Sequence, residues 1–182
     1  MRRTRRPGPP APRRTPLATL LQAVVAGAAG TAAMDLSQYL QYRAGGGGDD
    51  PLTWEFSSVK TWEGAPAPAQ IGRRLFEALG QRSLPDGAAN RANNVMHWGY
   101  GLSWAAAYGV LAGSAGRPRV RWGPMFGTAV FLADYALLPP TGLYQAIWTY
   151  DSKALAKDWG AHLVFGTVTA AAFAVLSRRR SS

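Results

Sequence analysis

The chain has 182 residues, of which 47% are apolar and only 16% are charged, and it contains no cysteine. That length suits one domain, and the lack of cysteine excludes a disulfide framework, a thiolate metal site and a cysteine nucleophile. The 20 Lys and Arg residues outnumber the 10 Asp and Glu residues, which gives a net charge of +10. Because soluble domains usually carry about 25% charged residues, the few charges here must be concentrated in particular segments.

Residues 1–16 form the first of these segments, with six arginines, five prolines and no acidic residue. This composition predicts a disordered basic tail, which we expect on the cytoplasmic side. Residues 17–40 follow without Lys or Arg and with Asp35 as the only acid, which predicts a membrane-spanning helix. A cleaved signal peptide ending near Thr31-Ala32-Ala33 is the alternative, although the apolar run continues past Asp35.

The first connection, residues 43–92, is the one sizeable segment that we expect outside the membrane. Within it, residues 69–80 are predicted to form a short amphipathic helix. Its apolar face is formed by Ile71, Leu75, Phe76 and Leu79. Its charged residues, Arg73, Arg74 and Glu77, lie away from that face. Two placements remain open for this helix: flat on the outer membrane surface, or packed against the ends of the membrane helices.

Three further apolar segments follow, at about residues 94–116, 122–139 and 154–176. With the first, each is about 17–25 residues long, which is enough to cross a hydrocarbon core of roughly 30 Å. We therefore predict an all-α fold, an integral membrane four-helix bundle over residues 17–180. A soluble bundle of Ala-rich helices is the alternative, but its helices would need a charged face toward water.

The remaining charged residues are distributed unevenly between the termini and the three connections. Both termini and the short second connection hold twelve basic residues and no acid, whereas the first and third connections hold eight basic and eight acidic residues. By the positive-inside rule, this predicts a multi-pass plasma-membrane protein with both termini in the cytoplasm (N-in/C-in). For tails that flank membrane helices, anionic lipid headgroups are a simpler partner than nucleic acid, which we do not expect to bind.

The second and fourth predicted helices repeat one another at an offset of 65 residues. His97 aligns with His162 and Tyr108 with Phe173, while the first and third helices match loosely through Asp35 and Asp134. The repeat predicts two pseudo-repeated helical hairpins, related by a pseudo-two-fold axis along the membrane normal. They run parallel because an even number of crossings restores the orientation.

Small residues recur every fourth position along three of the predicted helices. Such stripes let membrane helices approach closely where hydrophobicity gives no driving force for association. They predict a tight bundle, which could also associate with a second copy or with a partner. The residues that we expect at these helix contacts are Gly27, Thr31, Gly101, Ala105, Gly109, Gly166 and Ala170.

Each stripe ends in a polar group toward the outer side, so the four helices pool their titratable residues there. These residues are Asp35, His97, Asp134 and His162, with Asp158 one turn before His162. The repeat predicts that they form two Asp–His pairs. Because charge is costly in hydrocarbon, such residues normally face the bundle interior and serve a function.

Several roles fit this cluster. Each histidine could simply hydrogen-bond its aspartate and hold helices together. The cluster could instead handle protons or a cation, since histidine titrates near physiological pH. It could bind a divalent transition metal, for which imidazole and carboxylate are suitable ligands. A haem held by His97 and His162 is the least favoured role, because closely packed Gly and Ala leave little room for a macrocycle.

No motif of a conventional enzyme is present. The sequence lacks a Gly-x-Ser-x-Gly elbow, a His-Glu-x-x-His helix, a Walker loop and a dinucleotide fingerprint, and no Lys-Ser/Thr follows the Gly45–Gly48 run. We therefore predict a non-enzymatic protein that needs no cofactor, and the sequence assigns it no molecular activity.

Residues 94–180 resemble the YagU-like family of small bacterial inner-membrane proteins. The likeness lies in the His97-led helix with Tyr108-Gly109, and in four later elements: Trp122-Gly123, Leu138-Pro139-Pro140, Ala161-His162-Leu163-Val164 and Arg178-Arg179-Arg180. The chain departs from the pattern after the first helix, where Gln41-Tyr42-Arg43 stands in place of a Pro-Pro-Arg element. The resemblance implies a multi-helix inner-membrane protein without assigned catalytic residues.

Overall fold

The computed structural model describes residues 15–80, 82–114 and 119–178, and all regular structure in these ranges is helical. The prediction of an all-α fold is confirmed. The basic tail is left almost entirely outside the described residues. Six α-helices follow in chain order: α1 (Pro16–Ala44), α2 (Pro51–Ser57), α3 (Ala67–Ala78), α4 (Ala89–Ser114), α5 (Gly123–Leu137) and α6 (Ser152–Arg178).

The four long helices coincide with the four predicted spans, but their ends differ by a few residues. α1 begins at Pro16, where the Thr15 side chain accepts a hydrogen bond from the Ala18 backbone N–H, and it continues to Ala44. α4 begins at Ala89, five residues earlier than predicted. In this first part of α4, Asn90 and Asn94 donate hydrogen bonds to the Glu55 backbone carbonyl and so attach α2 to α4. The hydropathy of the sequence does not reveal such a contact.

The first connection contains two helices instead of the single predicted one. α3 covers the predicted amphipathic segment, whereas α2 was not predicted. The local chemistry of α2 is nevertheless clear. The Asp50 carboxylate accepts hydrogen bonds from the backbone N–H groups of Leu52 and Thr53, and Pro51 occupies the first helical position, as at many helix starts.

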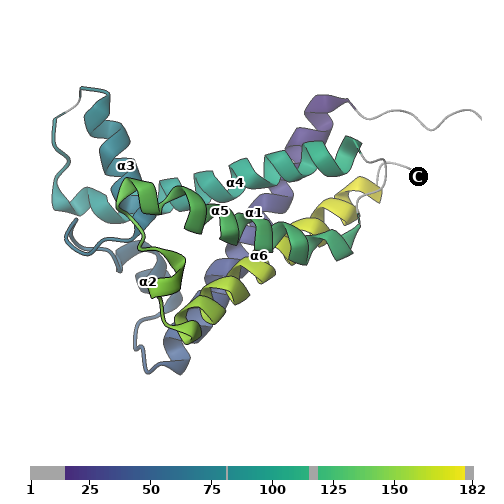
Figure 1. The fold of residues 1–182 in the computed structure, drawn as a ribbon. Helices are drawn as coiled ribbons and strands as arrows, with labels where there is room; N and C mark the ends of the chain where they lie inside the picture. The colour runs from purple at the N-terminus through teal and green to yellow at the C-terminus, as the bar shows by residue number, and fades with distance from the viewer. Residues whose placement is uncertain (1–14, 81, 115–118, 179–182) are drawn as a thin grey trace, which may run out of the picture.

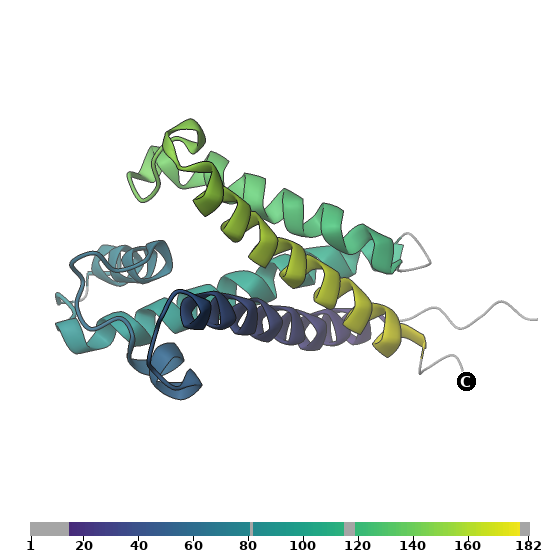
Figure 2. The same cartoon turned by 90° about the horizontal axis from the view of Figure 1, so that it is seen from below.

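The long helices are arranged as two hairpins in contact (Figures 1 and 2). α1 packs along α4 in the first hairpin, α5 packs along α6 in the second, and α1 also packs along α6. The repeat would require an equivalent interface between α4 and α5, but their backbones do not pack together. The two-fold relation therefore does not extend to the contact between the hairpins. Aromatic side chains bridge this gap, with the Tyr108 and Phe126 ring centroids 4.8 Å apart.

Close contact between the other helices depends on small residues. A Cβ atom on Gly27 or Gly109 of the first hairpin would overlap Ala105 or Ala23, respectively, on the facing helix. In the second hairpin, a Cβ atom on Gly166 would overlap the backbone of α5. Ala105 and Ala170 are fully buried, and Gly101 faces Thr31 across the α1–α4 contact. These positions lie at helix contacts, as the stripes predict.

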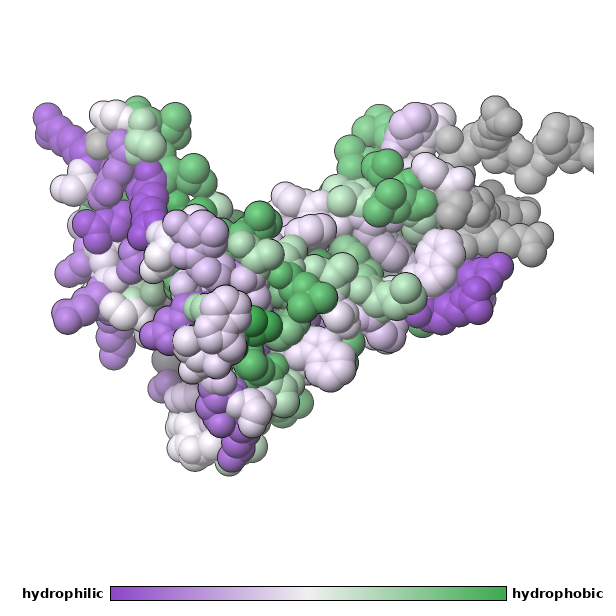
Figure 3. Space-filling model, viewed as in Figure 1, coloured by the Kyte–Doolittle hydropathy of each residue, from purple (hydrophilic) through white to green (hydrophobic). Residues whose placement is uncertain are grey.

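Many large apolar side chains point outward from the same helices, although Phe165 and Phe173 lie in the buried core. On α1 alone, six leucine and valine side chains are at least 41% exposed: Leu17, Leu20, Leu21, Val25, Leu36 and Leu40. Figure 3 shows hydrophobic side chains over much of the long helices, with hydrophilic ones gathered at the α2 and α3 end and in a smaller group at the opposite end. Exposed apolar surface of this extent marks a site of membrane or protein contact.

Within the described ranges, α1 and α6 are the two helices long and apolar enough to cross a membrane, judged by length and composition. α5 has only 15 residues and, at about 1.5 Å per residue, reaches roughly 22 Å, short of the roughly 30 Å of a hydrocarbon core. Its predicted range included flanking residues that form 3₁₀ turns on both sides (Val120–Trp122 and Pro139–Thr141). Two of the four predicted spans therefore meet the test of length and composition.

α3 crosses α4 at a steep angle, at the end of the bundle opposite the start of α1 and the end of α6 (Figure 1). Its contact with α4 is made by small residues, since a Cβ atom on Gly72 would press against Met96 and Ala92. Its larger apolar residues stay outside: Leu75 is 53% exposed and Leu79 is 78% exposed. α3 thus packs against a long helix and also keeps an apolar face free, so it combines features of the two predicted placements.

Candidate functional site

The four titratable residues predicted at the outer side form two Asp–His pairs. His97 Nε2 on α4 lies 2.7 Å from Asp35 Oδ1 on α1. His162 Nε2 on α6 lies 3.1 Å from Asp134 Oδ2 on α5. Each pair joins the two helices of one hairpin, which is the pairing that the repeat predicts.

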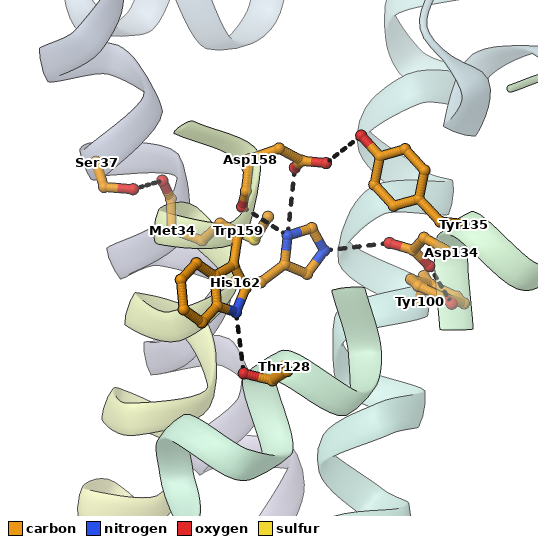
Figure 4. A network of polar contacts seen from close by, with 9 residues as sticks. All are labelled: Met34, Ser37, Tyr100, Thr128, Asp134, Tyr135, Asp158, Trp159 and His162. Carbon is orange, nitrogen blue, oxygen red and sulfur yellow. Dashed lines mark hydrogen bonds and ion pairs between the residues drawn. The ribbon is translucent and has the colours of Figure 1, made fainter. Parts of the chain in front are cut away.

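The second pair belongs to a larger network, drawn in Figure 4. The Tyr100 hydroxyl of α4 donates a hydrogen bond of 2.5 Å to Asp134 Oδ1, so Asp134 joins three helices. On the far side of the imidazole, His162 Nδ1 lies 2.9 Å from the Asp158 carbonyl oxygen and 3.3 Å from its carboxylate. The Tyr135 hydroxyl donates to that carboxylate at 3.0 Å.

The surroundings of His162 select a protonated ring. Nε2 faces the Asp134 carboxylate and Nδ1 faces the Asp158 carbonyl oxygen. These oxygens only accept, so both nitrogens must donate when both bonds are made, and an imidazole with two N–H groups carries a positive charge. His97 differs, because its one hydrogen bond within the described residues is that of Nε2 to Asp35.

Both pairs line a single cavity of about 500 Å³. It lies where α4 and α5 diverge, and α2, α3 and the segment before α6 contribute to its wall. The expectation of a tight bundle is wrong at this point, because only some of the helix pairs approach through small residues. Besides the two pairs, the polar side chains of the wall are those of Thr31, Gln38, Glu55, Ser58, Asn93, Asn94, Tyr100, Tyr144 and Asp158.

Charge is distributed unevenly around the cavity. Four carboxylates line it, those of Asp35, Glu55, Asp134 and Asp158. The histidines of the two pairs are the basic residues of the wall, and in the described part of the chain no Lys or Arg side chain lines it. Carboxylates therefore dominate the electrostatics of the cavity.

Sequence reasoning missed several residues of this site. Tyr100, Tyr135 and Tyr144 surround the carboxylates of Asp134 and Asp158, and burial raises the pKa of Tyr144 above its usual range. Helical spacing held a usable signal for Tyr100, which lies three residues after His97 and so on the same face of the helix. It held none for Tyr135, because a residue directly after Asp134 faces another direction. Tyr144 comes from the connection before α6 and offered no such signal.

Glu55 was also missed, and it attaches α2 to α4. Its carboxylate accepts a hydrogen bond of 3.4 Å from the Trp98 indole, and its backbone carbonyl accepts one of 2.9 Å from Asn94 Nδ2. Burial raises the pKa of the Glu55 carboxyl, and the nearby Asp35 carboxylate of α1 raises it further. The Trp98 hydrogen bond and His97, both on α4, act in the opposite direction.

A Glu55→Gln variant should therefore gain stability over the parent protein as the pH rises. A raised pKa in the folded state means that folding favours the protonated carboxyl. The contribution of Glu55 is fully present below its ordinary pKa of 4.5 and is lost as the pH rises through the folded-state value. Unfolding midpoints in detergent, measured for both proteins at pH 4 and pH 7, test this. A difference between the proteins that is the same at both pH values would contradict it.

The metal and haem interpretations find no fitting set of ligands. Within residues 15–80, 82–114 and 119–178, no group of three or more His, Asp and Glu side chains is arranged to hold a metal ion. A haem between His97 and His162 would need a free nitrogen on each ring facing the other. Both Nε2 atoms are instead held by carboxylates on separate helices.

Comparison with known proteins adds no relative to this description. No protein-family model, curated protein or solved structure matches the chain. The resemblance of residues 94–180 to the YagU-like family stays a prediction, and the function must be argued from the geometry of the site.

Proposed function

We propose that the chain is a multi-pass protein of the bacterial plasma membrane in which all four long helices cross the bilayer. The packing supports this, with small residues at the closest helix contacts and many large apolar side chains exposed on the outside. α5 would cross together with its flanking 3₁₀ turns and with local thinning of the bilayer, an accommodation known for short spans. Membership of residues 94–180 in the YagU-like family is part of the proposal.

The proposed orientation places both termini in the cytoplasm. Arg119, Arg121 and Arg178 lie at the end of the bundle where α1 begins and α6 ends, whereas the acidic residues of α2 and its neighbours lie at the other end. Positive charge next to short connections favours the cytoplasmic side, where anionic lipid headgroups can bind it. α3 would then lie on the outer surface with Leu75 and Leu79 toward the lipid.

The activity that we propose is non-enzymatic handling of protons or a cation by the two Asp–His pairs. One observation carries it: both pairs line the same 500 Å³ cavity. Pairs that served only to join helices would need no cavity beside them. Next to one, they can exchange protons with its contents.

A purely structural role is the second candidate, and Asp134 is the observation in its favour. Its carboxylate accepts from Tyr100 of α4 and lies against His162 of α6, so it connects three helices by itself. In this case the polar network would specify how the hairpins dock, and the cavity would be incidental.

Proton movement into liposomes separates the two candidates. Full-length protein is reconstituted in liposomes that contain a pH-sensitive dye, and the external medium is acidified. We expect the wild type to acidify the lumen faster than protein-free liposomes do. The double variant His97→Gln/His162→Gln should fall to the protein-free rate, because glutamine can hydrogen-bond but cannot carry the proton.

A matched control removes a helix–helix hydrogen bond far from the cavity. Gln22 Nε2 on α1 donates to the Leu176 carbonyl of α6 at the opposite end of the bundle, so Gln22→Leu should keep the wild-type rate. If the double variant keeps its helical content, its monodispersity and the wild-type rate as well, the proton-handling proposal fails and the structural role takes its place.

A further inference from the structure

We infer that the cavity binds an organic ammonium ion, with its nitrogen at the Asp35 carboxylate and its apolar body against the apolar and aromatic residues of the lining. This inference rests on the proposed function, since it names the class of cation that the same site would take. It depends on three features: the sign of the charge, two polar atoms without partners, and the size and composition of the wall.

The sign of the charge favours a cationic guest. Four carboxylates line the cavity, and no Lys or Arg from the described residues balances them there. Even with both histidines protonated, the wall carries more negative than positive charge. A buried carboxylate without a compensating cation is costly, so a guest that brings positive charge gains most from this site.

Two polar atoms on the α1 side have no partner among the described residues. They are Asp35 Oδ2 and Thr31 Oγ1, which lie one helical turn apart and both belong to residues of the cavity wall. Asp35 is 9% exposed and Thr31 is 1% exposed, so bulk water does not satisfy them. Buried polar groups are nearly always hydrogen-bonded. An ammonium group at the Asp35 carboxylate would bring N–H donors to a group of which one oxygen lacks a partner.

The lining also holds apolar and aromatic side chains, among them Met34 on α1, Val130 on α5, Phe165 on α6 and Trp54 on α2. A volume of about 500 Å³ far exceeds what a bare inorganic ion occupies and lies in the range of small-molecule pockets. Aromatic faces also attract a nearby cationic nitrogen. A charged nitrogen joined to an apolar body therefore matches the wall better than a metal ion does.

The test compares two probes of nearly the same shape, 2-(1-naphthyl)ethylamine, which is cationic at pH 7, and the neutral 2-(1-naphthyl)ethanol. Full-length protein in lipid nanodiscs is dialysed to equilibrium against each probe, with empty nanodiscs as the blank, and bound probe is read from naphthalene fluorescence. We expect saturable binding of the amine at one per protein, and binding of the alcohol weaker by about tenfold or more, as the loss of charge-assisted hydrogen bonds implies.

Two variants locate the binding site. Asp35→Asn should weaken binding of the amine by about tenfold or more. Thr31→Val keeps the charges and the Asp35–His97 pair intact, so it tests the same position with less risk to folding, and binding should weaken by at least severalfold. Glu63→Gln removes an exposed acid that does not line the cavity and should leave binding unchanged.

Three results would each overturn the inference: no saturable binding above empty nanodiscs, equal affinity for amine and alcohol, or unchanged affinity in both cavity variants. The liposome assay keeps this failure distinct from that of the proposed function. Loss of amine binding with intact proton movement rejects the ammonium guest alone. Intact amine binding without proton movement rejects proton handling and leaves the binding pocket.

Discussion

Replacing Asp134 by alanine is expected to lower the free energy of unfolding by about 3–5 kcal/mol, the cost of removing one partner from a buried charged pair. Asp134 is 8% exposed and His162 is 6% exposed, so bulk water cannot take the place of a partner that is removed. The substitution leaves the Tyr100 hydroxyl and the His162 imidazole without their acceptor. Unfolding in mixed detergent micelles, followed by circular dichroism, measures the change.

The matched control for this variant is Glu63→Ala. Glu63 is exposed and its carboxylate makes no hydrogen bond within the described residues, so the change should stay within about 0.5 kcal/mol. Asp134→Asn should fall between the two, since its amide oxygen still accepts from Tyr100. If Asp134→Ala costs no more than Glu63→Ala, the network does not hold the hairpins together.

Gly166→Ala is expected to be among the most damaging single-methyl changes in the bundle, at about 3 kcal/mol, near the upper end of typical overpacking costs. The added Cβ would overlap the backbone of Gly123 and Gly127 on α5. Backbone cannot swing aside as a flexible side chain can, so α5 and α6 must separate. The His162–Asp134 pair spans this contact, and proton movement should therefore fall along with stability.

The control lies on the same helix. Nothing lies within 4 Å of a Cβ atom built on Gly160, so Gly160→Ala should stabilise the protein by about 0.5–1 kcal/mol through the lower backbone entropy of alanine. Unfolding in detergent and the liposome assay are run on both variants. Equal stability of the Gly166→Ala and Gly160→Ala proteins would show that α5 and α6 do not pack as closely as described.

The Asp–His pairs are the part of the site that sequence periodicity could predict. His97 and His162 stand at equivalent positions of a repeat, and each begins or continues a stripe of small residues. A stripe specifies which face of a helix meets its neighbour, so the polar residue on that stripe must meet the neighbour as well. The partner aspartates followed from the same reasoning, because Asp35 is the single acid of the first predicted span and Asp134 is that of the third.

The cavity could not be predicted in this way. Its existence depends on the unequal contacts α1–α6 and α4–α5, whereas the repeat treats these as equivalent. Its wall includes Glu55, Tyr144 and Trp54, which come from connections and a short helix rather than from the periodic segments. Connections carry no periodic pattern that says which face of the bundle they cover, so their residues cannot be assigned to the site from spacing.

By itself, the sequence determined the helical class, the positions of the four long helices, the small residues between them and the residues of the two pairs. All of these follow from local composition and from the 3.6-residue period, which act within one helix. Only the tertiary structure decided that α4 and α5 diverge, that both pairs face one cavity, and that Asp35 Oδ2 and Thr31 Oγ1 lack partners among the described residues. These features depend on how side chains of different sizes fit between helices that are distant in sequence, and packing of that kind leaves no periodic trace along the chain.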